Sequence, residues 1–439
     1  MRVAFHTLGC KVNQYETEAM RQQFVKAGFE SVGEEDFADV YIINTCTVTN
    51  LADRKSRQYI RRMKKGNPDA IIAVTGCYAQ VKPEELSALP EVDIVAGTGE
   101  KNNILDYVQE FFEAREPQSH IKTYDELCEY QDRGIITSME SRTRAYIKIQ
   151  EGCDRFCAYC LIPFARGKVR SRNPQEVVDE ARALIEKGFK ELILTGINTA
   201  LYGTEEGFRD KYPDWAAVDG IESIIKAIND LPGEFRIRLS SLEPAVINAE
   251  YVERLMKYDR LCHHLHLSCQ SGADHVLKLM NRPYTRSEYL DIVKVLRKCD
   301  PLYGITTDLI VGFPGETDED FADSLDLVEK SEFCKVHAFR FSKREGTAAA
   351  LMKEQVASEV KNSRVTNLIE KGDNVSEAFF NKCAGDNRIV LFEEWDGDYI
   401  TGYTDNYIKV YAKGSEADLN CFREVKLLEI YKDGMKGEI

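Results

Sequence analysis

The sequence predicts an α/β chain in three parts: an N-terminal doubly wound parallel sheet, a central partial (β/α)6 barrel of the TIM type, and a small C-terminal antiparallel β-barrel. Through the first two parts, strand-like runs alternate with amphipathic helical patterns, which is typical of parallel sheets. Many of these runs end at a cysteine or a small polar residue. About the last 65 residues change to short alternating strands with Gly or Asp at the turns. We place the three parts at residues 1–125, 139–370 and 374–439.

In the first part, three strand-like runs are each followed by a cysteine. The runs are Val3–Thr7, Val40–Asn44 and Ile71–Thr75, the cysteines are Cys10, Cys46 and Cys77, and helical patterns cover 16–26 and 52–65. A doubly wound sheet brings the carboxyl ends of its strands to one edge, so we expect the three thiols to converge. A single cysteine at a strand end could simply be a buried apolar side chain. Three cysteines at three strand ends favour a metal site with three thiolate ligands instead.

The central part contains six strand-like runs separated by helical patterns. The first run, Tyr146–Gln150, leads into a loop, and later runs end near residues 195, 241, 270, 312 and 341. Helices are expected at 175–187, 221–230 and 287–297, among others. Active sites of such barrels collect at the carboxyl ends of the strands. The loop after the first run therefore lies where chemistry is expected.

That loop carries the spacing CxxxCxxC, formed by Cys153, Cys157 and Cys160. Four cysteines would complete a zinc site or a fully ligated iron–sulfur cluster. Three cysteines leave one iron of a 4Fe–4S cluster open to a small ligand. The loop resembles that of radical S-adenosylmethionine enzymes, in which the open iron binds S-adenosylmethionine. The alternatives are a zinc knuckle that borrows a distant ligand, or three unrelated buried thiols.

Polar residues at the other strand ends suit a sulfonium cofactor with amino and carboxylate groups. Any one of them could instead cap a helix or solvate a loop. The candidate S-adenosylmethionine-binding residues are Gly196, Asn198, Ser240, Glu243, Gln270 and Asp308.

The net charge of −15 argues against indiscriminate binding of nucleic acid, because phosphate contacts require positive charge. Local charge differs from the total. Residues 52–66 carry seven Lys or Arg against one acidic residue, with Arg57 and Arg61 on one helical face. A second basic cluster, which includes Arg166 and Arg170, follows the CxxxCxxC loop. We expect both clusters to contact RNA, although a charge run can also be a solvated face.

The chain has 13 cysteines and begins without an apolar leader-like run, which predicts a reducing cytoplasmic setting. The seven cysteines outside the two triads lack ligand spacing. No run approaches the roughly 18 apolar residues of a membrane helix, so no membrane partner is expected.

Motifs across essentially the whole chain resemble the methylthiotransferase family, which joins a cysteine-containing N-terminal domain, a radical S-adenosylmethionine barrel and a C-terminal TRAM domain. They are Thr7–Asn13, Asn44–Cys46, Thr75–Cys77, the CxxxCxxC loop, Ile162–Gly167 and Ile310–Thr317. Within the family, Gly9–Glu18 is most similar to the branch that modifies N6-threonylcarbamoyladenosine at position 37 of tRNA. The residues just after the first cysteine usually differ in branches that act on isopentenyladenosine or on a ribosomal-protein aspartate.

The resemblance implies two 4Fe–4S clusters, one on each triad, with sulfur carried on the cluster of Cys10, Cys46 and Cys77. It implies methylthiolation of C2 of the modified adenine, with Arg166 and Arg170 as candidates to grip the threonylcarbamoyl carboxylate. The implied partners are the tRNA anticodon loop, an electron donor such as flavodoxin or ferredoxin, and a sulfur donor. The acidic balance of residues 374–439, with 8 Lys or Arg against 13 Asp or Glu, leaves the TRAM domain's share of tRNA binding open.

Two alternatives remain for the function. The enzyme could act on another modified adenosine or on a ribosomal-protein side chain, because substrate choice lies in loops. The chain could also be a noncatalytic iron–sulfur regulator that binds RNA, although such a protein has no need of an open iron.

Overall fold

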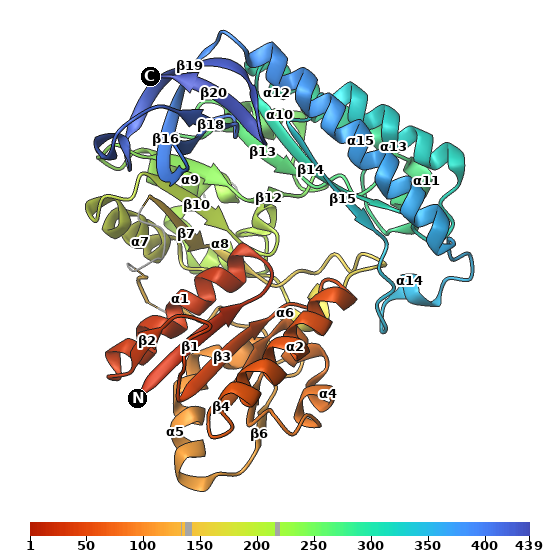
Figure 1. Cartoon of the computed structure of the whole chain (residues 1–439). Helices are drawn as coiled ribbons and strands as arrows, with labels where there is room; N and C mark the ends of the chain where they lie inside the picture. The colour runs from red at the N-terminus through yellow and green to blue at the C-terminus, as the bar shows by residue number, and fades with distance from the viewer. Residues whose placement is uncertain (133, 137–142, 216–219) are drawn as a thin grey trace.

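The computed structural model describes residues 1–132, 134–136, 143–215 and 220–439. Figure 1 shows three units along the chain, with the N-terminal unit at one end and the C-terminal barrel against the far side of the central sheet. The predicted boundary at residue 139 lies outside the described residues. Every helix that the structure describes is too short or too polar to span a bilayer.

The N-terminal unit is a six-stranded parallel sheet in the order β2-β1-β3-β4-β5-β6. Apolar side chains pack on both faces, those of α1 and α5 on one and those of α2 and α4 on the other. The predicted doubly wound sheet is therefore confirmed. The strands are β1 (Arg2–Thr7), β2 (Glu30–Val32), β3 (Val40–Thr45), β4 (Ile71–Gly76), β5 (Ile94–Ala96) and β6 (Gln118–His120), and the helices are α1 (Lys11–Lys26), α2 (Asn50–Gly66), α3 (Cys77–Val81), α4 (Pro83–Ser87) and α5 (Ile104–Ala114).

The central unit is a partial barrel of parallel strands, as predicted. One sheet has the order β11-β10-β7 and the next has the order β12-β13-β14-β15. β12 continues β11 after the single residue Ser240, so the two sheets form one curved set of six strands. In the described part of the chain no strand pairing closes β15 onto β7, so the barrel is open on that side. The strands of the two sheets are β7 (Arg144–Lys148), β10 (Glu191–Thr195), β11 (Arg236–Leu239), β12 (Ser241–Leu242), β13 (His264–Leu267), β14 (Gly304–Val311) and β15 (Lys335–Arg340).

Helices cover the outside of this barrel and share one large apolar core with its strands. Predicted helices at 175–187, 221–230 and 287–297 are present with shifts of one or two residues at their ends. The short hairpin β8 (Gln150–Glu151) and β9 (Arg170–Ser171) borders the cysteine loop. The helices are α6 (Ile162–Arg166), α7 (Pro174–Glu186), α8 (Phe208–Lys211), α9 (Ile221–Asn229), α10 (Ala249–Leu255), α11 (Asp274–Leu279), α12 (Arg286–Cys299), α13 (Asp318–Ser331), α14 (Ala348–Leu351) and α15 (Ser358–Cys383).

The C-terminal unit is a closed five-stranded barrel in the order β16-β17-β18-β20-β19. Its pairings are antiparallel except that between β18 and β20, which is parallel. The predicted start at residue 374 falls inside α15, and the first barrel strand begins at Asn387. The strands are β16 (Asn387–Asp396), β17 (Tyr399–Thr404), β18 (Lys409–Ala412), β19 (Phe422–Tyr431) and β20 (Gly434–Glu438).

The barrel docks on the amino ends of the central strands. Arg238 donates to the carbonyl oxygens of Thr404 and Asp405 at 3.0 and 3.1 Å. Gly304 opens β14 at the same junction, where a Cβ atom would lie 2.0 Å from the carbonyl oxygen of Asn406. The carboxyl ends of the central strands therefore stay clear of the barrel and face the N-terminal unit.

Candidate functional site

The first cysteine triad lies at one edge of the N-terminal sheet. Cys10 is the N-cap of α1, Cys46 follows β3 and Cys77 begins α3 directly after β4. β1, β3 and β4 are neighbours in the sheet, so the three cysteines follow adjacent strands. Gly9 makes this approach possible: its φ is +102°, and a Cβ atom there would lie 2.7 Å from Cys46 Cβ. The expected convergence of the three residues is present.

The spacing of these thiols indicates what they can hold. Two sulfurs on one zinc ion lie roughly 3.8 Å apart, given Zn–S bonds of about 2.3 Å. Among the described residues, no three cysteine sulfurs lie within 4.8 Å of one another. Burial raises the pKa of the Cys46 thiol to about 12, and burial also raises that of Cys10. Binding of metal must therefore release protons from this triad.

The second triad lies on the loop after β8. Gly152 begins this loop with φ +76°, and a Cβ atom there would lie 1.8 Å from the Lys168 carbonyl oxygen. Arg282 Nη1 donates to Cys157 Sγ at 3.4 Å, and the Ile162 amide donates to Cys160 Sγ at 3.4 Å. Such donors to sulfur are usual around iron–sulfur clusters, where they tune the potential.

Three of the predicted S-adenosylmethionine-binding residues gather beside this triad. Glu243 is the centre: its carboxylate accepts from Asn198 Nδ2 at 2.6 Å, Arg155 Nε at 3.0 Å and Arg282 Nη1 at 2.6 Å. The Asn198 Oδ1 and Ser240 Oγ atoms are buried without a hydrogen-bond partner in the described part of the chain. Buried polar atoms without partners carry a free-energy penalty that a polar ligand would relieve. The donor set therefore fits a ligand with amino and carboxylate groups.

The remaining predicted cofactor residues lie in two places. Gly196 follows β10 against Gln150, whose Oε1 would lie 3.0 Å from an added Cβ. Gln270 adopts φ +69°, and its amide donates to the Asp308 carbonyl oxygen at 2.8 Å. The Asp308 side chain instead contacts His266 and Ser268. Asp308 is thus engaged with its own sheet rather than with the Glu243 group.

Arg166 and Arg170 do not lie where the sequence suggested. Arg166 is fully buried: Nη1 donates to Glu16 and Glu151, both at 2.7 Å, and Nε donates to Cys77 Sγ at 3.3 Å. Arg170 is 4% exposed, and its guanidinium is directed at backbone carbonyl oxygens and Glu151. The substrate contact stays a prediction for both, and in this structure the two guanidinium groups are bound within the protein by Glu16, Glu151 and backbone carbonyl oxygens.

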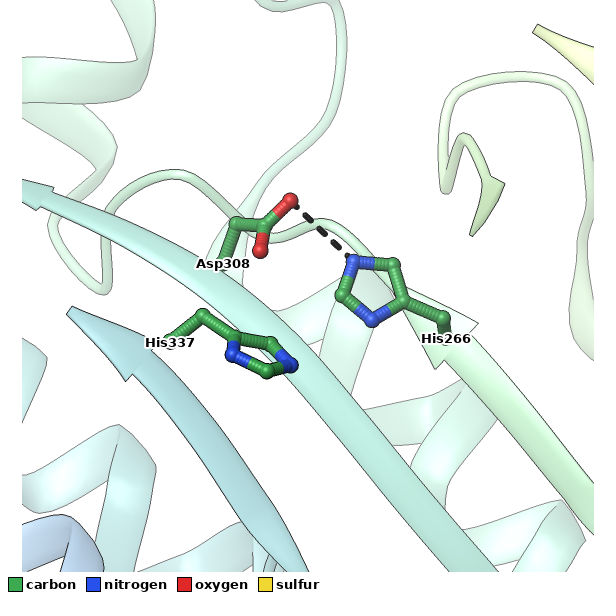
Figure 2. Close-up of side chains that lie close together, drawn as sticks. All are labelled: His266, Asp308 and His337. Atoms are coloured by element: carbon green, nitrogen blue, oxygen red, sulfur yellow. Dashed lines mark hydrogen bonds and ion pairs between the residues drawn. The ribbon is translucent and has the colours of Figure 1, made fainter. Parts of the chain in front are cut away.

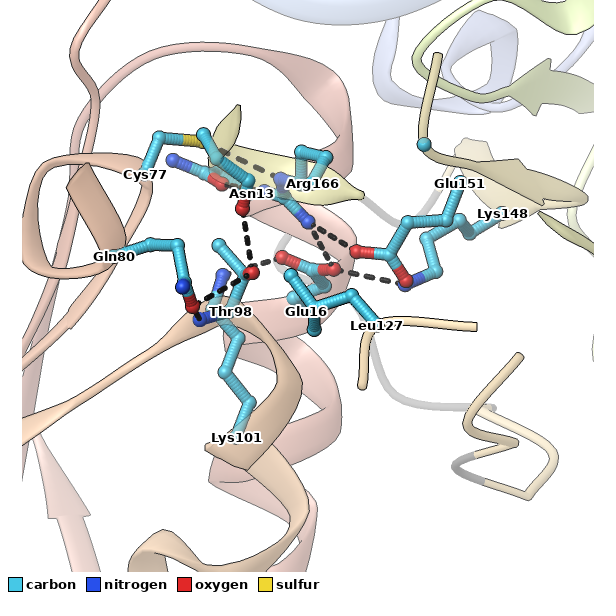
Figure 3. A network of polar contacts seen from close by, with 12 residues as sticks. Asn13, Glu16, Cys77, Gln80, Thr98, Lys101, Leu127, Lys148, Glu151 and Arg166 are labelled. Atoms are coloured by element: carbon cyan, nitrogen blue, oxygen red, sulfur yellow. Dashed lines mark hydrogen bonds and ion pairs between the residues drawn. The ribbon is translucent and has the colours of Figure 1, made fainter. Parts of the chain in front are cut away.

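These contacts belong to a buried polar network between the N-terminal unit and the central unit, shown in Figure 3. Glu16 on α1 accepts from Lys101, Lys148 and Arg166, and all four side chains are fully buried. α3 packs on α6, so the helix that begins with Cys77 contacts the helix just after Cys160. The two cysteine triads are therefore held at the same domain interface.

The network contains more cations than anions. Lys101, Lys148 and Arg166 face the two carboxylates of Glu16 and Glu151. Burial alone would lower the pKa of Arg166, but Cys77 and the two glutamates hold it well above its usual value. A net positive surrounding stabilises anionic sulfur ligands, so the network fits an iron–sulfur cluster on Cys77 and its partners.

Arg57 and Arg61 lie one turn apart on α2, as predicted. Arg57 donates to Tyr78 Oη at 2.6 Å and to Glu85 at 2.8 Å, and the Arg61 side chain is 58% exposed. Both remain candidates for contact with RNA.

Sequence reasoning missed Lys11, which directly follows Cys10. Its side chain is half-buried, and no hydrogen bond or ion pair joins it to another residue in the described ranges. Burial and then the nearby Arg238 lower its pKa to about 8, and Arg144 and Glu191 also lie within electrostatic range. Lys11 therefore extends from the first cysteine triad toward the strands of the central barrel. Its place in the motif Thr7–Asn13 is the signal that could have found it.

Comparison with known proteins gives matches over the whole chain. Residues 2–97 match the uncharacterized protein family UPF0004, and residues 147–328 match the radical SAM superfamily. The threonylcarbamoyladenosine tRNA methylthiotransferase MtaB of Bacillus subtilis is 43% identical over 432 residues, covering 97% of this chain and 94% of that protein. MtaB of Thermotoga maritima is 38% identical over 435 residues, covering 99% and 96%. A tRNA-2-methylthio-N(6)-dimethylallyladenosine synthase of Clostridium novyi is 33% identical over 451 residues, covering 100% and 96%.

Solved structures share the fold. The radical S-adenosylmethionine methyltransferase TsrM from Kitasatospora setae superposes with a TM-score of 0.54 at 14% identity, covering 90% of this chain and 79% of that one. The likeness supports the predicted fold class and carries nothing about the reaction.

Proposed function

This chain belongs to the tRNA methylthiotransferase family, and we propose that it methylthiolates C2 of N6-threonylcarbamoyladenosine at position 37 of tRNA. The observation that carries the proposal is the position of the two cysteine triads at one domain interface. Cys77 of the first triad accepts a hydrogen bond from Arg166, which lies six residues after Cys160 of the second. A sulfur source and a radical source would share one reaction space in this arrangement.

The residues present fit two 4Fe–4S clusters and S-adenosylmethionine. Cys10, Cys46 and Cys77 would hold one cluster, and Cys153, Cys157 and Cys160 the other. With S-adenosylmethionine these groups supply a deoxyadenosyl radical, a sulfur atom and a methyl group. The protein binds the cofactor through Asn198, Ser240 and Glu243, as their geometry supports, with Gly196 and Gln270 as further candidates.

Aromatic C2 carries no acidic proton that a side-chain base could remove, so the protein's own work is positioning and exclusion of water. Arg282 links the two parts of the central site, because its Nη1 donates both to Cys157 Sγ and to Glu243. A shift of Glu243 would therefore also change the hydrogen bond from Arg282 to Cys157. In the proposed reaction, Arg282 fixes the bound cofactor relative to Cys157.

The threonylcarbamoyl group adds a carboxylate to the base, and this requires a cation near the site. Lys11 is the candidate that the geometry favours, because it lies next to Cys10 and has no ion-pair partner among the described residues. A base in an anticodon loop is unpaired, so it can reach such a position at modest unstacking cost. The proposal also includes an electron donor such as flavodoxin or ferredoxin, a sulfur donor and a cytoplasmic location.

The test of the substrate is methylthiolation of tRNA with and without the threonylcarbamoyl group, read by mass spectrometry of nucleosides. Activity on the modified tRNA alone is expected. Lys11→Met should lower the preference for the threonylcarbamoylated base about tenfold or more, while Lys26→Met at the far end of α1 should not change it. Equal activity on tRNA that lacks the group would contradict the substrate assignment and leave the radical chemistry intact.

The test of the two clusters is the iron content after anaerobic reconstitution. Roughly eight irons per chain are expected, and about four after replacement of either triad by Ala. Tightly bound zinc with little iron would contradict the cluster assignment.

A further inference from the structure

We propose that His266, Asp308 and His337 bind one divalent transition-metal ion inside the central barrel. The three residues lie on the neighbouring strands β13, β14 and β15. Their ligand atoms all lie within 4.8 Å of one another, and in the described part of the chain no other group of three His, Cys, Asp or Glu side chains is as close. Figure 2 shows the three side chains turned toward one common point.

The strand register places these side chains on one face of the sheet. Asp308 and His337 are direct partners across β14 and β15, and His266 pairs with Thr306, two residues before Asp308. Side chains two residues apart on a strand point to the same side. Ile305 and Leu309 alternate with them and belong to the apolar core under the helices. The cluster therefore faces the barrel interior.

The orientation of His266 is that of a metal ligand. Its Nδ1 lies 2.8 Å from Thr306 Oγ1, which leaves Nε2 directed at Asp308 Oδ2 at 3.1 Å. Ser268 Oγ donates to the same carboxylate oxygen at 3.2 Å. Ligating histidines usually bind a second partner through their other nitrogen, and ligating carboxylates accept hydrogen bonds. Thr306 and Ser268 supply these outer contacts.

The cluster is also accessible. The side chains of His266 and Asp308 are 15% and 28% exposed, and His337 is exposed. No hydrogen bond joins the His337 ring nitrogens to another residue in the described ranges. Two imidazoles and one carboxylate suit Mn²⁺, Fe²⁺, Co²⁺ or Zn²⁺ and leave coordination positions open to water or an anion. Mg²⁺ and Ca²⁺ prefer all-oxygen sites.

Comparison with other His–Asp pairs of this chain shows what is particular here. His263 lies 2.8 Å from Asp300, and His275 lies 2.9 Å from Asp320. Asp405 Oδ2 also lies 3.9 Å from His263 Nδ1. In the part of the chain that the structure describes, however, neither pair forms a group of three ligand atoms that all lie within 4.8 Å of one another. A His–Asp hydrogen bond alone therefore does not predict a metal. The third ligand, His337, carries the inference, and it uses none of the six cysteines.

The test is a titration with Mn²⁺ of the enzyme that holds both iron–sulfur clusters in the oxidised state. In that state the 4Fe–4S clusters have no spin, so the electron paramagnetic resonance signal of free Mn²⁺ can be measured and the bound ion counted. One Mn²⁺ per chain is expected for the unchanged enzyme. His337→Gln should weaken the affinity about tenfold or more, and His266→Ala with His337→Ala should abolish binding.

His275→Ala is the matched control, because His275 is an exposed histidine whose pair with Asp320 has no third ligand. This variant should bind Mn²⁺ as the unchanged enzyme does. His337 is exposed, so His337→Gln should fold normally, which cluster absorbance and circular dichroism verify. Equal Mn²⁺ binding by the unchanged enzyme and the double variant would overturn the proposal, as would no binding by either. The readout is independent of tRNA, so this result and that of the substrate test can differ.

Discussion

Replacement of Glu16 by Gln tests whether the buried network holds the two domains together. Glu16 has no exposed surface and forms ion pairs with three buried cations, Lys101, Lys148 and Arg166. Removal of one partner from a buried ion pair costs about 3–5 kcal/mol, because the remaining charge is left without compensation. Gln keeps an oxygen acceptor, so we expect about 3 kcal/mol for Glu16→Gln and about 5 kcal/mol for Glu16→Ala.

A multidomain chain does not unfold in one step, so a local measurement is needed. Amide hydrogen exchange of α1 and α6 reports the opening of the interface directly. A loss of about 3 kcal/mol corresponds to exchange roughly 150-fold faster in these helices. Strands of the C-terminal barrel, which do not contact the network, should keep their rates and act as an internal reference.

Glu35→Gln is the matched control, because Glu35 pairs with Arg62 at a site where both side chains are more than half exposed. Exposed pairs of this kind contribute less than about 1 kcal/mol. If exchange of α1 rises less than about fivefold in Glu16→Gln, the network does not hold the interface and the reasoning from burial fails.

Three further predictions test the separate roles of the sites. Cys157→Ala should abolish deoxyadenosine formation, whereas Cys46→Ala should leave it measurable and stop sulfur insertion; equal loss in both would show that the first triad does not carry sulfur. Arg57→Ala with Arg61→Ala should weaken tRNA binding and reduce its salt dependence, which filter binding at several salt concentrations measures; an unchanged salt slope would exclude α2 from the interface. Asp300→Asn should destabilise the barrel junction by about 2 kcal/mol at pH 6 and by less at pH 9, as measured by hydrogen exchange of β16.

The pH dependence of that last variant follows from the groups around Asp300. Burial alone would raise the pKa of Asp300, but hydrogen bonds from His263 and Arg388 hold it well below its usual value. Its contribution is therefore present above about pH 4. The hydrogen bond with Asp300 raises the pKa of His263, so that contribution is full below about pH 6.5 and is lost as pH rises through the folded value. Asp259→Asn, an exposed neighbour, should show no such trend.

The sequence was sufficient for the cysteine triads because topology decides their placement. In a parallel sheet the carboxyl ends of neighbouring strands meet, so Cys10, Cys46 and Cys77 had to converge once β1, β3 and β4 were recognised as neighbours. The same rule placed Asn198 and Glu243 beside the CxxxCxxC loop. Periodicity alone was enough for these predictions, since each depends on where a strand ends and not on which side chain pairs with which.

The sequence could not show which side chains pair with one another. Arg166 follows the cluster loop in sequence, which suggested an exposed cation at the barrel mouth. Its partners Glu16 and Asn13 are about 150 residues away in the sequence. The sequence around Arg166 does not predict these contacts. Residue 374, the predicted start of the C-terminal part, lies within the continuous helix α15. Gly372 lies within α15, where a Cβ atom would be 3.0 Å from Val336 Cβ. The glycine serves close packing of the helix on β15.

The buried position of Arg166 also constrains how the proposed reaction can proceed. A hinge between the N-terminal unit and the barrel would have to break its contacts with Cys77, Glu16 and Asn13 together, and each of these atoms is buried. Breaking buried charged contacts is costly, so we expect the opened state to be rarely populated. We therefore expect the two triads to keep a fixed separation while the tRNA base moves between them.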